Sequence, residues 1–291
     1  MSTSSLPVTS GLHPGIEKLP RVGRILFGVA LVGFGVQQLI AQAFIRLVPP
    51  LPAWMPAQPG LAVVLGVLLL ATGAAILLDW KARTAAAVLA ALILVSVICL
   101  HIPQIAANPG QGFRWTNPCK ALALFGGALA ISAMSPSSEK HRSFSLARLG
   151  DTLVPYGPRL FFGIFLIICG IQHFVYADFV VTLIPAYIPG HLFWTYFCAV
   201  ALIAGGAGVL LDATLRWAAT LSGVMILLWV FMLHLPRALA DLHQPGEMNG
   251  VFEALALSGV AFLLTQNSVV QAPSSMDRSL GAAAPRPITE S

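Results

Sequence analysis

The sequence predicts an all-α protein integral to a membrane, and two observations carry this prediction. Hydrophobic residues make up 57% of the 291 residues, whereas Asp, Glu, Lys and Arg together make up only 9%. A soluble domain has about a quarter charged residues, so this chain has too few charges to cover a surface in water. In addition, the apolar residues form eight runs of about 17 to 25 residues, the length that a helix needs to cross a bilayer.

Charges and clusters of Pro and Gly separate the eight predicted transmembrane helices. The apolar runs lack the apolar–polar alternation that strands of a membrane barrel would show, so helices are the expected spanning elements. The predicted spans are residues 24–45, 61–79, 84–102, 119–135, 159–177, 193–211, 216–235 and 250–266.

A duplication runs through this hydrophobic body. Residues 71–79 (ATGAAILLD) recur 133 positions later as residues 204–212 (AGGAGVLLD), and Leu100-His101-Ile-Pro103 recurs as Leu233-His234-Leu-Pro236. Each copy holds four predicted spans, an even number, so both copies enter the membrane from the same side. The prediction is a tandem parallel repeat of two four-helix bundles about a pseudo-two-fold axis along the membrane normal.

The repeat divides the chain into five parts. We expect the last part, rich in Ser, Ala and Pro, to be disordered. The parts are a flexible N-terminal segment 1–23, a first repeat 24–135, a cytoplasmic linker 136–158, a second repeat 159–266 and a C-terminal tail 267–291.

The distribution of basic residues predicts the orientation. Of the 16 Lys and Arg residues, 12 fall on the side that holds both termini and four fall on the other side. Positive charges favour the cytoplasmic side, so both termini are expected there. The basic residues lie at the ends of apolar segments rather than in a stripe, so membrane lipid, and not nucleic acid, is the expected partner.

Polar side chains inside the predicted spans are the candidates for a ligand-binding site, because such groups are costly in a membrane. The glutamines and His173 would either hydrogen-bond to neighbouring helices or line a polar pocket in the outer leaflet whose donors suit a quinone head group. No catalytic residue is predicted. The candidate ligand-binding residues are Gln37, His101, Gln172, His173, His234 and Glu253.

His101 and His234 are each followed two residues later by a proline. The prolines remove the usual donors to the carbonyls of Cys99 and Met232, so each histidine is expected to end its helix and satisfy the last carbonyls. The alternative is a pair of symmetry-related ligand or proton-handling groups in an outer vestibule.

Lys120 and Glu253 occupy equivalent positions of the repeat but have opposite charges. Glu253 could simply favour the positive end of its helix dipole. The alternative prediction is that both residues face the pseudo-axis and pair across the two repeats.

Two aspartates close the second span of each repeat. Asp79 and Asp212 are each followed four residues later by an arginine, Arg83 and Arg216, which predicts an ion pair within each inner turn.

Other chemistries lack their motifs. His234, Asp241, His243 and Glu247 gather near the last outer loop, but without H-x-x-x-H or H-E-x-x-H spacing no metal site is predicted. The four cysteines have no C-x-x-C spacing, which argues against a thiol–disulfide exchange enzyme. A phosphate-binding loop and a nucleophile elbow are also missing, so soluble-type nucleotide or hydrolase chemistry is excluded.

Several landmarks occur in a familiar order: Arg159 and Gly163, then Gly170-Ile-Gln172-His173, then residues 205–212 (GGAGVLLD) and 252–257 (FEALAL). This order resembles the DoxX family of small membrane proteins, over residues 159–266 and again over 24–135. The chain thus resembles two fused DoxX-like units, except that the first has Lys120 where the second has Glu253.

The resemblance implies a bacterial cytoplasmic (inner) membrane and a role as a membrane subunit of a redox or oxidative-stress complex. Such a protein would be a quinone-linked oxidoreductase subunit rather than a stand-alone enzyme, with quinone as cofactor and a soluble or membrane redox partner. Two alternatives remain open. Internal repeats and polar groups in the membrane favour a small-solute transporter or channel, and glycines seven residues apart, such as Gly163 and Gly170, favour a non-catalytic scaffold.

Overall fold

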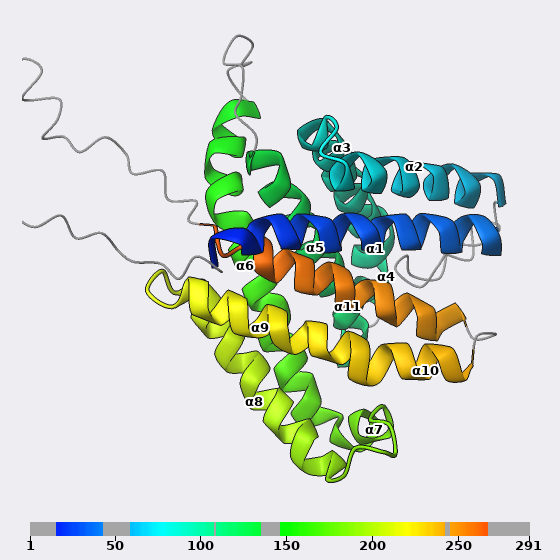
Figure 1. Ribbon diagram of the computed structural model, residues 1–291, viewed down its shortest axis with the longest axis vertical. Coiled ribbons are helices and arrows are strands. Elements are labelled where there is room, and N and C mark those ends of the chain that lie inside the picture. Colours follow the sequence, from blue (N-terminus) through cyan, green and yellow to red (C-terminus); the bar gives the residue numbers. More distant parts are fainter. Residues whose placement is uncertain (1–15, 43–58, 108, 135–145, 242–244, 267–291) are drawn as a thin grey trace, which may run out of the picture.

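The computed structural model describes residues 16–42, 59–107, 109–134, 146–241 and 245–266, and these contain helices but no strand (Figure 1). In chain order the long elements are α1 (Leu19–Ala41), α2 (Pro59–Leu77), α3 (Ala82–Ser96), α5 (Thr116–Met134), α6 (Leu146–Val175), α8 (His191–Leu210), α9 (Leu215–Trp229) and α11 (Pro245–Leu263). The short elements are η1 (Ile16–Lys18), η2 (Val97–His101), α4 (Ile102–Ala107), η3 (Gly112–Trp115), α7 (Ala177–Thr182), η4 (Val230–His234) and α10 (Leu235–Ala240).

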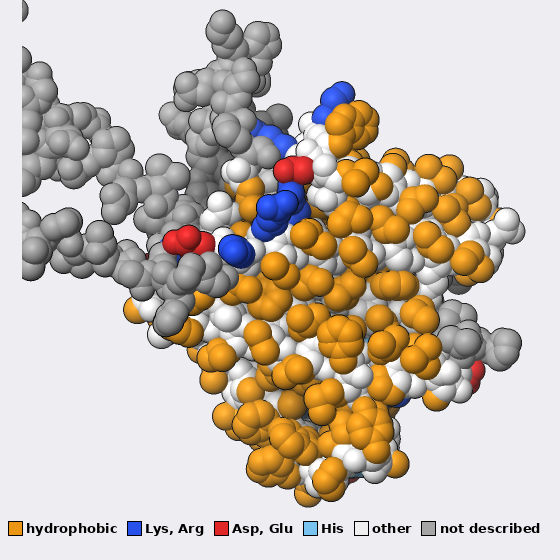
Figure 2. Space-filling view, viewed as in Figure 1, with side chains coloured by type: hydrophobic (Ala, Val, Ile, Leu, Met, Phe, Trp, Pro, Cys, Tyr) orange, Lys and Arg blue, Asp and Glu red, His pale blue; other side chains and the backbone are white. Residues whose placement is uncertain are grey.

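Six helical stretches are long and apolar enough to cross a membrane, and within an apolar 18-residue segment of each only 28% to 39% of the residues are buried inside the protein. The remaining apolar side chains therefore lie on the outside, as Figure 2 shows over most of one face, with charges gathered mainly at one end. Such a surface is suited to lipid, so the protein is integral to a membrane. The stretches are Ile16–Ala41, Pro59–Leu77, Ala82–Ala107, Tyr156–Val175, His191–Leu210 and Leu215–Ala240.

The long helices pack in a ring. Each packs against the next along the chain, and α11 closes the ring by packing against α1 (Figure 1). In addition, α5 and α11 contact each other. The fourth long helix of each half packs against the first long helix of the other half: α5 against α6, and α11 against α1. The two halves therefore have a common core, which includes Phe27, Phe162 and Val260.

The helices before Pro103 and Pro236 do not end at the histidines, contrary to the sequence prediction. Instead, α3 and α9 widen into the π-helical segments η2 and η4, which end at His101 and His234, and continue as α4 and α10. The wider turn lets the backbone N–H groups of Ile102 and Leu235 reach the carbonyls five residues earlier. A π turn thereby absorbs the disruption that a proline causes inside a helix.

The predicted loss of donors to the Met232 carbonyl has a visible compensation. Tyr187, from the segment between α7 and α8, donates its hydroxyl to that carbonyl oxygen. An unsatisfied carbonyl at this depth is costly, so the tyrosine stabilises the interrupted helix.

The two aspartates that close α2 and α8 pair with arginines of other helices. Asp79 pairs with Arg24 of α1, and Asp212 pairs with Arg159 of α6. Arg159 also donates to the carbonyl of Leu210 at 2.6 Å. Each pair therefore ties the first two long helices of its half together, a longer-range role than the predicted pair within one turn.

Two segments predicted to lie outside the repeats are helical where the chain is described. The predicted linker 136–158 is helical from Leu146, because leucines at positions 146, 149 and 153 have the spacing of an amphipathic helix. The predicted flexible segment 1–23 is helical from Ile16. The predicted tail 267–291 lies outside the described residues.

Glycines allow close contacts between the backbones of neighbouring helices. A Cβ added at Gly35 of α1 would lie 2.6 Å from the backbone nitrogen of Leu70 and 2.8 Å from the carbonyl oxygen of Gly66, both in α2. Between the halves, a Cβ added at Gly23 of α1 would lie 2.5 Å from the carbonyl oxygen of Gly259 in α11. Small residues let helix backbones approach in a membrane, where van der Waals packing drives helix association.

We predict that Gly35→Ala lowers the free energy of unfolding by about 1 to 3 kcal/mol, the usual cost of overpacking, because the backbone of α2 must move. Thermal unfolding in detergent measures the effect. Gly60→Ala is the control, because a Cβ there meets nothing within 4 Å. Equal melting temperatures for the two variants would show that the α1–α2 contact does not require glycine.

Candidate functional site: a polar cluster between the two halves

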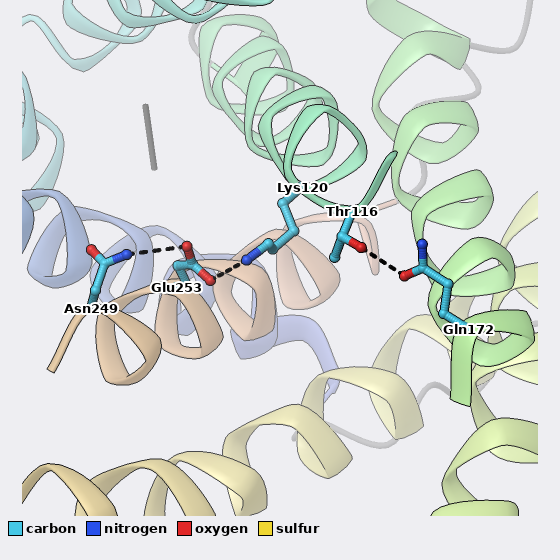
Figure 3. Close-up of polar contacts among 5 residues, drawn as sticks. All are labelled: Thr116, Lys120, Gln172, Asn249 and Glu253. Atoms are coloured by element: carbon cyan, nitrogen blue, oxygen red, sulfur yellow. Dashed lines mark hydrogen bonds and ion pairs between the residues drawn. The ribbon is translucent and has the colours of Figure 1, made fainter. Parts of the chain in front are cut away.

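An ion pair joins the two halves of the protein. Lys120 of α5 donates to Glu253 of α11, with Nζ 2.5 Å from Oε2, and the two side chains are only 19% and 14% exposed. Asn249, one turn before Glu253, donates its amide to the other carboxylate oxygen at 3.3 Å. The sequence prediction that Lys120 and Glu253 pair is therefore confirmed (Figure 3).

The same helix α5 also reaches α6. Thr116, one turn before Lys120, donates its hydroxyl to Gln172 Oε1 at 2.8 Å, and Gln172 donates its amide to the carbonyl of Gly112 at 2.9 Å. Figure 3 shows Lys120 pointing toward α11 and Thr116 toward α6. We call Thr116, Lys120, Gln172, Asn249 and Glu253 the central polar cluster.

The two histidines that end the π-helical segments flank this cluster. η2 packs against α5 and η4 packs against α11, which places His101 and His234 on segments that contact these two helices. The ring of His234 lies against Gly250, where an added Cβ would be 2.8 Å from Nδ1. The π turns therefore carry the histidines toward the fourth helix of each half.

Some buried polar atoms near the cluster have no hydrogen-bond partner among the described residues. These include Nε2 of His101, a residue that is 2% exposed, and Oδ1 of Asn249, a residue that is 3% exposed. An unsatisfied buried donor or acceptor costs about 1 to 3 kcal/mol. Such atoms in a native structure mark places where a water or a ligand group completes the hydrogen bonding.

The structure brings four of the six predicted site residues together: Glu253 and Gln172 in the cluster, and His101 and His234 beside it. His173 bonds instead to the carbonyl of Cys169 in its own helix, at 2.7 Å from Nδ1, and stacks on Trp229.

Gln37, the remaining predicted site residue, is half-buried on α1. Its neighbour Gln38 donates to the carbonyl of Ala62 in α2 at 2.8 Å. Gln38 and Gln172 thus both make the bonds between helices that were one interpretation of the glutamines.

The residues considered for a metal do not form a ligand set where they are described. Glu247 pairs with Arg237 at 2.6 Å, and His243 lies outside the described residues. Within the described part of the chain, no three His, Cys, Asp or Glu residues lie close enough to hold a metal ion.

Thr116 and Asn249 were missed by sequence reasoning, although a signal for them exists. Each stands four residues before a member of the ion pair, and the two are 133 positions apart, like Lys120 and Glu253. A spacing of four places both side chains on one helix face. A search for polar pairs preserved in the repeat would have identified them.

The fold and the cluster define an α-helical membrane protein with a partly buried charged contact between two halves. Comparison with known families gives a match to a domain of unknown function (DUF8561) over residues 162–270, from α6 to just beyond α11. No curated protein and no solved structure matches the chain.

We predict that Lys120→Glu and Glu253→Lys each lower stability by about 2 to 5 kcal/mol, the cost of leaving one buried partner unpaired. The double swap Lys120→Glu/Glu253→Lys restores opposite charges and is expected to recover most of the loss. Yield of monodisperse protein and thermal unfolding in detergent are the measurements. A double variant as unstable as the sum of the single variants would mean that the contact does not stabilise the protein.

Proposed function

We propose that the chain crosses the membrane eight times, as a tandem repeat of two four-helix units with both termini in the cytoplasm. The six long apolar stretches support this, together with the packing of α5 and α11 in the same ring as those stretches. The elements α3, η2 and α4 begin and end 133 residues before α9, η4 and α10, which supports the repeat. The excess of basic residues at the end that holds Arg24 and Arg159 supports the orientation.

Cysteine labelling tests this topology. In a variant without the four native cysteines, we expect Ser5→Cys and Ser274→Cys to react with an impermeant maleimide only after the cells are permeabilised. Gly110→Cys, on the α4–η3 connection where an added Cβ meets nothing within 4 Å, should react in intact cells. Labelling of Ser5→Cys and Gly110→Cys from the same side would rule out the eight-span arrangement.

The function we propose is that of a DoxX-like membrane subunit of a redox or oxidative-stress complex in a bacterial cytoplasmic membrane. A quinone head group is the proposed ligand, beside the central polar cluster. The observation that carries this proposal is the buried His101, whose Nε2 has no partner among the described residues.

The donor and acceptor chemistry of these residues fits both forms of a quinone. A histidine protonated on Nε2 donates to a quinone carbonyl, and the other tautomer accepts from a quinol hydroxyl. The Oδ1 atom of Asn249 offers a second acceptor for a quinol. When bound, the quinone or a partner protein would supply the redox chemistry, while these side chains bind and orient the head group.

We predict that His101→Leu/His234→Leu abolishes quinone retention while the protein still inserts and unfolds cooperatively. Native mass spectrometry of protein purified gently from its own membranes measures the retained quinone. His191→Leu, at the start of α8 and outside the cluster, is the matched control and should retain wild-type quinone. Full retention in the double variant would remove the histidines from the site.

A second candidate function is transport of protons or a small solute. The observation that favours it is the Lys120–Glu253 pair between helices of a membrane protein, since ionisable groups at such places mark ion pathways and proton relays. A flux assay in liposomes separates the candidates, because a transporter moves solute without a redox partner. A scaffold, the third alternative, would tolerate alanine at the histidines and glutamines with no loss of quinone or flux.

A further inference from the structure

A cavity opens at the opposite end of the helices from the central polar cluster. Its volume is about 490 Å³, and its walls come from the start of α1, the turn between α2 and α3, and the last turns of α5. The lining residues are Arg21, Arg24, Asp79, Ala82, Ile131 and Met134.

Two arginines and one aspartate line the cavity, so one positive charge is left over. Arg24 pairs with Asp79 across the α1–α2 contact. Arg21, one turn earlier on α1, is exposed, and no described acid pairs with it. The cavity thus offers the planar donors of a guanidinium, which match the oxygens of a phosphate group.

The other wall is apolar. Ile131 is 1% exposed and Ala82 is 5% exposed, and both line the cavity together with the half-buried Met134. A guanidinium beside an apolar wall matches a molecule that has both an anionic group and an apolar chain, whereas a free anion would use only the guanidinium. The position also agrees, because the cavity lies where long apolar helices begin and end, at the level of lipid head groups.

We propose that this cavity binds the phosphodiester head group of an anionic membrane lipid, with Arg21 contacting the phosphate and the start of an acyl chain lying along Met134. The paired Arg24 and Asp79 form the part of the cavity wall between Arg21 and Met134. This inference requires that the protein is in a membrane, but it is independent of the quinone proposal.

The second half of the chain provides an internal comparison. The ion pair is present there as Arg159 with Asp212, but the position equivalent to Arg21 in the sequence repeat is Tyr156. The proposal therefore expects one tightly held anionic lipid per chain. It also expects that Tyr156→Arg adds a second one.

Native mass spectrometry of the full chain tests this after reconstitution in nanodiscs of phosphatidylcholine with a minor fraction of phosphatidylglycerol. We expect one phosphatidylglycerol to be retained per wild-type chain, and Arg21→Gln to lower its retention about tenfold, the usual effect of losing one charge-assisted hydrogen bond. Lys81→Gln is the charge-matched control, because Lys81 lies over the ring of Trp80 and does not line the cavity. It should retain the lipid.

Three results would overturn the proposal. The first is equal loss of phosphatidylglycerol in Arg21→Gln and Lys81→Gln, which would indicate attraction by net charge alone. The second is no preference for phosphatidylglycerol over phosphatidylcholine in the wild type. The third is displacement of the lipid by millimolar inorganic phosphate, which would assign the cavity to a soluble anion. Quinone retention measured in the same spectra reports separately on the central polar cluster.

Discussion

The contact between Lys120 and Glu253 constrains the position of the two helices that join the halves of the protein. Lys120 and Glu253 are partly buried side chains of opposite charge, and leaving either without its partner would cost about 2 to 5 kcal/mol. Their pairing requires that α5 and α11 be adjacent. Because α5 also packs against α6, and α11 against α1, this contact lies where all four helices that join the halves come together.

The need to satisfy backbone groups away from water explains the features around that contact. Pro103 and Pro236 interrupt hydrogen bonding in two otherwise continuous helices, and the chain responds with a π turn rather than an end. The π turns direct His101 and His234 toward α5 and α11. The same local distortion that repairs the backbone therefore brings ionisable rings close to the ion pair.

The sequence predicted the helices well, because apolar runs of span length leave few alternatives. Each of the eight predicted ranges overlaps one of the long helices, although every helix begins before its predicted range. The repeat also predicted the Lys120–Glu253 contact, since equivalent positions near a pseudo-axis meet each other. The partners of Asp79 and Asp212 were missed because Arg24 and Arg159 are more than 50 residues away in the chain. Local spacing reveals a contact within one turn, whereas a contact between helices depends on packing.

The place of His173 was missed for a related reason. Its depth in the span predicted a polar environment, but depth does not say which way a side chain points. In the structure its ring bonds to its own helix and stacks on Trp229, a residue that the first half replaces with Ser96. A stacking partner from another helix cannot be inferred from one span.

The two halves differ at several equivalent polar positions of the sequence repeat. A duplicated chain could keep two equal sites, yet its equivalent positions have diverged where polar chemistry is concentrated. Thr116 corresponds to Asn249, Lys120 to Glu253 and Arg21 to Tyr156. The first two differences both lie in the central polar cluster, which contains a single ion pair with one partner from each half. A ligand at that place would therefore meet an amide and a carboxylate from one half and an ammonium and a hydroxyl from the other. Such a composite site exists once per chain, and either half alone would hold an unpaired charge.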